Sequence, residues 1–165
     1  MNAARNRPRN KVNVKGRDTG PRGRFARLDF GLLVSGAYRS LTPNARALLI
    51  ELISLHTGQN NGKLWLSEVD AARRMGVADP KVARKAFIEL TEAGFIAMTK
   101  DAHFNVKEGR GRARQWRLTW LFNNAQLKSA TNEWQSFAAS SNAANKRMDH
   151  GLRAIADYRK SPLQK

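Results

Sequence analysis

Two helix start signals follow each other closely in the middle of the chain, and a glycine lies between them. Ser67 suits the residue that caps a helix start, and Gly76 suits the residue that ends that helix in a left-handed conformation. Asp79 followed by Pro80 opens a second helix, because proline is favoured at the first helical position. The sequence therefore predicts two short helices on either side of a tight turn, the second running to about Gly94.

A further helix and several strands flank this pair. Thr42 and Pro43 repeat the start signal, and apolar residues follow at helical spacing to about His56. The stretches LWL (64–66), FIAMTK (95–100) and QWRLTWL (115–121) are typical of strands. Together these patterns predict a mainly helical α+β fold. The large aromatic residues expected to pack in it are Tyr38, Trp65, Trp116, Trp120 and Trp134.

The charge of the chain is strongly positive and unevenly distributed. Lys and Arg number 30 against 13 Asp and Glu, which gives a formal net charge of +17. Residues 1–24 carry +7 of this total, and the remaining +10 belongs to the rest of the chain. Such an excess favours a polyanionic partner, most often nucleic acid, because bound counterions are released on contact. The basic residues of the tail are Arg5, Arg7, Arg9, Lys11, Lys15, Arg17, Arg22 and Arg24.

Composition divides the chain into three parts. Residues 1–24 hold few large apolar side chains, so this basic tail is expected to be disordered when free. Residues 25–122 carry the predicted helices and strands and form the expected domain. Residues 123–165 are expected to form a helical extension that folds back on the domain or pairs with a second copy of the chain, although Gly151 argues against one continuous helix. Its apolar stripe consists of Ala144, Met148, Leu152 and Ile155.

Neither a membrane span nor a catalytic site is indicated. No apolar run reaches the length of a membrane-spanning helix, and Cys is absent, which fits a cytoplasmic protein. His56, His103 and His150 lack metal-ligand spacing, and no common nucleophile or phosphate-loop motif occurs. Glu68 and Asp70 are two apart on a predicted helix and point to different faces, which makes a poor acid–base pair. We therefore expect no catalytic residue, no metal and no cofactor.

Three cations lie on the outer side of the helix that begins at Pro80. On a helical wheel Lys81, Arg84 and Lys85 face away from the apolar arc, at the end where the helix dipole disfavours positive charge. A negatively charged partner would reverse that cost, and DNA-binding helices meet phosphates and guanine edges with their N-terminal residues. The alternative is an ordinary solvated basic face. The apolar arc consists of Val82, Ala83, Ala86, Phe87, Leu90 and Ala93.

The stretch SEVDAARRMGVADPKVARKAFIELTEAGFI (67–96) resembles a winged helix-turn-helix of the kind found in bacteria, phages and mobile elements. With the flanking helix and the trailing strands, the resemblance covers about residues 42–121. It implies that Lys81, Arg84 and Lys85 read DNA, with Arg84 on guanine and the two lysines mainly on phosphate. The implied backbone contacts are Arg73 and Arg74 on the first helix and Lys107, Arg110, Arg112 and Arg114 in the wing between the strands.

This resemblance implies sequence-specific binding of double-stranded DNA. The expected task is transcription regulation by occupation of a promoter or operator. Two alternatives stay open: a replication initiator or mobile-element protein that binds an origin, and a non-specific RNA- or nucleoid-binding protein for which charge alone would suffice. The expected partners are DNA in the nucleoid, a second copy of the chain as a homodimer, and RNA polymerase or a replication protein.

Overall fold

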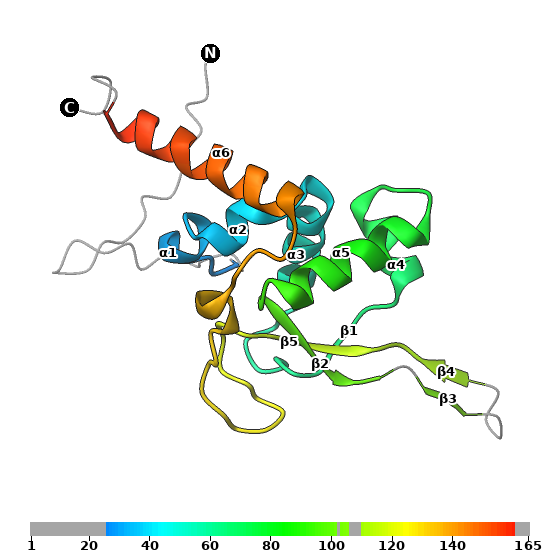
Figure 1. The fold of residues 1–165 in the computed structure, drawn as a ribbon. Coiled ribbons are helices and arrows are strands. Elements are labelled where there is room, and N and C mark those ends of the chain that lie inside the picture. The colour runs from blue at the N-terminus through cyan, green and yellow to red at the C-terminus, as the bar shows by residue number, and fades with distance from the viewer. Residues whose placement is uncertain (1–25, 102, 106–109, 161–165) are drawn as a thin grey trace, which may run out of the picture.

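The computed structural model describes residues 26–101, 103–105 and 110–160, and it has the mainly helical α+β architecture that the sequence predicts (Figure 1). The basic tail and Lys107 lie outside the described residues. The helices are α1 (Phe30–Leu33), α2 (Gly36–Ser40), α3 (Pro43–Ser54), α4 (Glu68–Met75), α5 (Pro80–Glu92) and α6 (Asn142–Lys160), with a 3-10 turn at Glu133–Ser136. The strands are β1 (Leu64–Trp65), β2 (Ile96–Lys100), β3 (His103–Asn105), β4 (Arg110–Arg112) and β5 (Gln115–Leu118).

The predicted caps start three helices where the sequence places them. The side chains of Thr42, Ser67 and Asp79 accept hydrogen bonds from backbone N–H groups in the first turns of α3, α4 and α5. Gly76 ends α4 with a φ of 71°, the left-handed conformation that glycine adopts at little cost. Local signals therefore set the boundaries of the three helices that form the centre of the fold.

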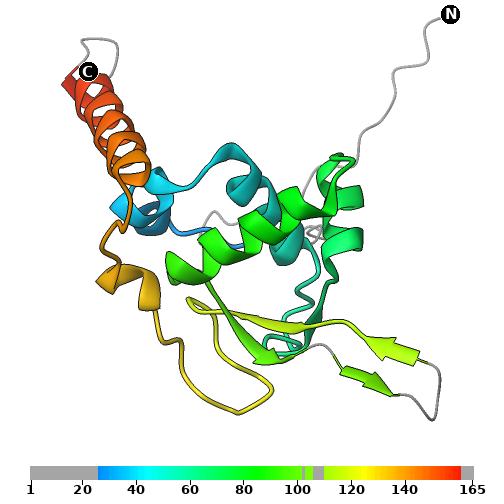
Figure 2. The ribbon, with the colours of Figure 1, turned by 45° about the vertical axis from the view of Figure 1, so that its right-hand side comes forward.

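The sheet is antiparallel, with strand order β1-β5-β2. A register shift between Met98 and Lys100 marks an irregularity in β2, and beyond it β3 and β4 form a separate two-stranded ribbon that extends away from the helices (Figure 2). The sequence predicts an irregular loop between two strands, and that expectation is wrong over 103–105 and 110–112. His103 pairs with Arg112, Phe104 with Gly111 and Asn105 with Arg110, and each stretch of three residues is too short to indicate a strand by itself.

The strand expected over residues 115–121 is shorter than predicted, because its last residues turn toward the end of α5. The backbone N–H of Thr119 donates to the carbonyl oxygen of Phe95 at 3.1 Å. Its hydroxyl donates to the carbonyl oxygen of Gly94 at 2.7 Å. Strand β5 therefore ends at Leu118, where side-chain alternation would have carried it further.

Helices α3, α4 and α5 meet the sheet around one apolar core. The arc predicted on α5 is buried, except that Val82 is half-buried, and the ring of Phe87 stacks on Trp116 with centroids 4.6 Å apart. Trp120 is buried as expected, whereas Trp65 is 44% exposed. The expectation that Trp65 packs in the core is wrong, because its position on a two-residue strand turns its side chain to the outer face.

A buried asparagine closes the far end of the sheet. Asn61 is fully buried, and its side-chain oxygen accepts from the backbone N–H of Leu118 at 2.7 Å. Its amide nitrogen faces the carbonyl oxygens of Leu118, Leu121 and Phe122 at 2.9, 3.2 and 3.0 Å. The sequence shows only a turn-forming cluster at this place, so the structural role of Asn61 is a finding of the structure.

The segment after the sheet packs against the domain. Trp134 stacks on Phe95 with ring centroids 6.3 Å apart. Gly94, with a φ of 74°, lets the backbone of Glu133 and Trp134 approach, since an added Cβ would lie 2.6 Å from each. Residues 123–137 therefore cover one side of the core before α6 begins.

Helix α6 runs without a break through Gly151, and its first part lies on α2 (Figure 1). The close approach explains the glycine, because an added Cβ would meet the Arg39 side chain at 3.0 Å. Arg147 fastens the contact by donating from Nε to the carbonyl oxygen of Ser40 at 2.6 Å. The expected apolar stripe thus folds back on the domain, while Leu152 on it stays 38% exposed.

One further contact joins the start of α3 to the C-terminal half of α5. The carboxylate of Glu89 accepts from the backbone N–H of Thr42 at 3.1 Å and from its hydroxyl at 2.8 Å. Glu89 is half-buried, and it completes the start of α3. Among the described residues, no helix has the length and apolar character needed to cross a membrane.

Candidate nucleic-acid interface

The start of α5 presents three cations on its exposed side. Asp79 caps the helix by accepting from the backbone N–H of Lys81 at 2.8 Å, and the buried arc on the opposite side fixes which face is outward. Lys81, Arg84 and Lys85 are all exposed, as the helical wheel predicts. The structure therefore brings together the three residues expected to read DNA.

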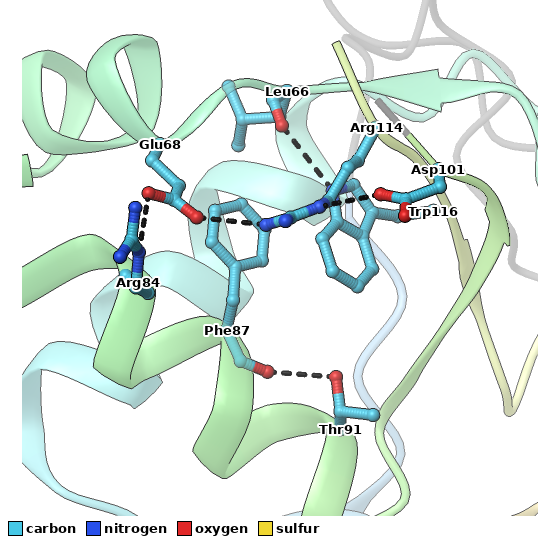
Figure 3. A network of polar contacts seen from close by, with 8 residues as sticks. All are labelled: Leu66, Glu68, Arg84, Phe87, Thr91, Asp101, Arg114 and Trp116. Atoms are coloured by element: carbon cyan, nitrogen blue, oxygen red, sulfur yellow. Dashed lines mark hydrogen bonds and ion pairs between the residues drawn. The ribbon is translucent and has the colours of Figure 1, made fainter. Parts of the chain in front are cut away.

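A carboxylate from α4 holds one of these cations. Oε2 of Glu68 lies 2.8 Å from Nε of Arg84, and Oε1 of the same carboxylate lies 2.8 Å from Nη1 of Arg114 (Figure 3). Arg114 extends the chain of contacts, because its Nε is 3.1 Å from Oδ1 of Asp101 at the end of β2. The four side chains join the starts of α4 and α5 to the base of the β-ribbon.

Among these four side chains, Arg114 has a pKa that is shifted by its neighbours. A hydrogen bond with Asp101 raises the pKa of Arg114, burial opposes the rise, and the bond with Glu68 supports it. The Arg114 side chain is 38% exposed, while Glu68 is only 19% exposed between its two partners. Nearby, the indole N–H of Trp116 donates to the carbonyl oxygen of Leu66 at 3.4 Å and fixes the adjacent strand.

The other cations expected at the DNA backbone differ in their surroundings. Nε of Arg74 lies 2.9 Å from Oε2 of Glu51, and Nη2 donates to the hydroxyl of Ser54 at 2.7 Å, which turns this side chain toward α3. The Arg73 side chain is 79% exposed, and its Nη1 lies 3.9 Å from Oδ1 of Asp70, which is a long distance for an ion pair. Arg110 and Arg112 lie on β4, opposite Asn105 and His103 of β3.

An apolar recess of about 540 Å³ lies between α5 and the sheet, beside the contacts of Glu68. Phe87 and Trp116 line it together with Ile88 and Met98, which are about half exposed. Arg84 stands at its margin. The outer side of α5 is thus basic at its first turns and apolar further along, where it faces the strands.

Comparison with protein-family models, curated proteins and solved structures found no match. The geometry of the chain itself therefore carries the functional argument. Within the ranges that the structure describes, no group of three His, Asp or Glu side chains is placed to hold a metal ion.

Sequence reasoning missed the part played by Glu68. The residue stands out in the sequence only as an acid in the first turn of a helix, where the dipole favours it. Its partners lie 16 and 46 positions further along the chain, and no local spacing connects them. The one available signal was the presence of basic side chains at the start of α5 and in residues 110–114.

Proposed function

We propose that the protein binds double-stranded DNA through the exposed side of α5, as a winged helix-turn-helix, and regulates transcription by occupying a promoter or operator. The observation that carries the proposal is the state of Lys81 and Lys85. Within the described part of the chain, no carboxylate lies within ion-pair distance of either side chain. Their charges add to the positive end of the helix dipole and are available to a polyanion.

The neighbouring arginines differ from these two lysines, because they are paired with carboxylates. Arg74 and Arg114 are engaged with carboxylates of the protein itself, and so contribute less to an external field. Arg84 is paired as well, but its side chain remains 63% exposed. If this basic face met only solvent, there would be no reason for the arginines to be paired with carboxylates while the two lysines at the same helix start are left without them.

The shape of the region fits a duplex. The major groove of B-DNA, about 12 Å wide, admits a single α-helix, and α5 presents its first turns with Arg84 available to the acceptor edge of guanine. The ribbon of β3 and β4 extends away from the helices and carries Arg110 and Arg112 on β4, and these residues would contact phosphates as a wing does. The tail, residues 1–24, would add non-specific affinity.

The test uses duplexes selected from a random library by the wild-type protein. Arg84→Ala should lower the preference for the selected sequence by about 1–3 kcal/mol, because a bidentate guanine contact is lost. Lys81→Ala and Lys85→Ala should weaken binding to all duplexes and reduce the salt slope by about one each. Arg153→Ala removes an exposed cation from α6 and serves as the control, which should leave both quantities nearly unchanged.

Deletion of residues 1–24 separates non-specific electrostatic affinity from the recognition of bases. The deletion should weaken binding to every sequence alike and flatten the salt dependence, while the selected motif stays the same. If Arg84→Ala behaves like this deletion, α5 does not read bases. Chromatin immunoprecipitation with sequencing then separates the tasks: sharp promoter peaks support a regulator, a repeat-rich origin peak supports an initiator, and a diffuse map supports non-specific binding.

A further inference from the structure

The carboxylate of Glu68 stands between two arginines that come from different elements. One oxygen accepts from Arg84 on α5 and the other from Arg114 beside β5, each at 2.8 Å (Figure 3). Since both oxygens are used and the side chain is only 19% exposed, Glu68 has little room to meet a partner directly. Its effect on any bound molecule passes through the arginines.

The choice of donor atom on Arg84 is informative. The bond to Glu68 uses Nε, and guanidinium carries five N–H donors, so the four donors on the two Nη atoms are left for a partner. These terminal donors are the ones that can match the two acceptors of guanine. The carboxylate therefore occupies the one donor that bidentate reading can spare, and it restricts a side chain that is otherwise flexible.

From this geometry, and resting on the proposed function, we infer that Glu68 is a positioning residue that sets sequence specificity. It holds the Arg84 guanidinium in one orientation before DNA arrives. Through Arg114 and Asp101 the same carboxylate fixes the base of the ribbon, so the reading side chain and the wing are placed by one group. Glu68 itself touches no base.

This inference predicts two effects of opposite sign. A negative charge beside a phosphate-binding surface weakens binding to every DNA sequence, so its removal should tighten non-specific binding. The same removal frees Arg84 to adopt other rotamers, so discrimination between sequences should fall. A carboxylate that serves only to stabilise the fold would not produce this combination.

The experiment compares Glu68→Gln with Asp70→Asn, each measured by selection from a random duplex library and by titration of selected and scrambled duplexes. Asp70 lies in the same first turn and carries the same charge, and its carboxylate contacts Ser67 and Arg73. For Glu68→Gln we expect preference for guanine at the Arg84 position to fall on the order of tenfold, with tighter binding to scrambled duplexes. Asp70→Asn should tighten both and keep the motif.

A second variant separates position from charge. Glu68→Asp keeps the charge but shortens the side chain, so one carboxylate no longer reaches both arginines. It should lose discrimination without gaining non-specific affinity, and it keeps the test decisive if the glutamine variant does not fold. If both Glu68 variants keep the wild-type motif, the inference is overturned while the proposed function stands. If the wild-type protein selects no motif at all, the proposed function fails and the inference fails with it.

Discussion

The buried amide of Asn61 should be among the least replaceable groups in the chain. Its side chain makes four contacts of 2.7–3.2 Å with the backbone of Leu118, Leu121 and Phe122, at a place with no access to solvent. Asn61→Asp keeps the shape and the accepting oxygen, but it sets a second oxygen against three carbonyl oxygens. The four donor and acceptor relations thus become one favourable contact and three repulsive ones.

The magnitude follows from the groups left without partners. Each buried polar group that loses its hydrogen bond costs about 1–3 kcal/mol, and partial relaxation reduces the sum. We expect Asn61→Ala to lower the free energy of unfolding by about 3 kcal/mol, and Asn61→Asp to lower it by about 4 kcal/mol or more at pH 7, where the introduced carboxyl is also charged.

The pH dependence gives a second handle on the same substitution. Burial among carbonyls raises the pKa of the introduced carboxyl above its unfolded value. The penalty relative to wild type is therefore full above the folded pKa, and it shrinks as the pH falls toward the unfolded pKa, because the protonated form can donate one hydrogen bond. Urea unfolding followed by tryptophan fluorescence, at several pH values, measures both quantities.

The neighbouring Asn60 supplies the control. Asn60 is only half-buried, its oxygen accepts from the backbone N–H of Thr57, and its amide donates to one carbonyl oxygen. Asn60→Asp should cost about 1 kcal/mol, since a single hydrogen bond is lost near solvent. Equal costs for the two aspartate variants would refute the reasoning, because burial and the three facing carbonyls would then have no effect.

Three further substitutions test other parts of the fold. Gly94→Ala and Gly76→Ala each place a Cβ on a residue in the left-handed conformation, with nearly the same φ of 74° and 71°. Each substitution should therefore lower the free energy of unfolding, measured with urea, by about 1–2 kcal/mol. Gly94→Ala should lower the free energy of unfolding more than Gly76→Ala does, because its Cβ meets the backbone of Glu133 and Trp134. Equal decreases for the two variants would contradict that contact. Burial opposes ionisation of Glu133, but hydrogen bonds from Thr131 and Arg117 outweigh it and lower its pKa. Glu133→Gln should therefore cost about 1 kcal/mol at pH 7, with the difference disappearing in thermal melts as the pH falls below that lowered pKa; a difference that persists in strong acid would count against the assignment.

Local chemistry explains what the sequence could predict. The caps at Thr42, Ser67 and Asp79 and the glycine at 76 act within a few residues, so the bounds of α3, α4 and α5 could be inferred from the printed chain. The three cations on the outer side of α5 followed from helical periodicity in the same way.

Contacts between distant segments explain what the sequence could not predict. The bonds of Glu68, Glu89 and Asn61 span between 16 and 61 positions, and each of these residues would be equally plausible as a solvated side chain. The exposure of Trp65 likewise depends on the pairing of β1 with the distant β5. The pairing of β3 with β4 is local, and it could not be predicted because each strand is only three residues long. Helix α6 continues through Gly151, and the close approach of Arg39 explains why glycine stands there despite its weak helix preference.

The contact of Glu89 limits how far α5 can move when a partner binds to it. Together with Glu68 it fastens this helix at two points along its length, to Thr42 on α3 and to the first turn of α4. A helix anchored twice cannot tilt or slide to improve a poor fit without breaking charged hydrogen bonds. In the proposed complex with DNA, the structural adjustment would therefore fall to the duplex and to the ribbon, and a duplex that bends easily would be preferred over a stiff one with the same base edges.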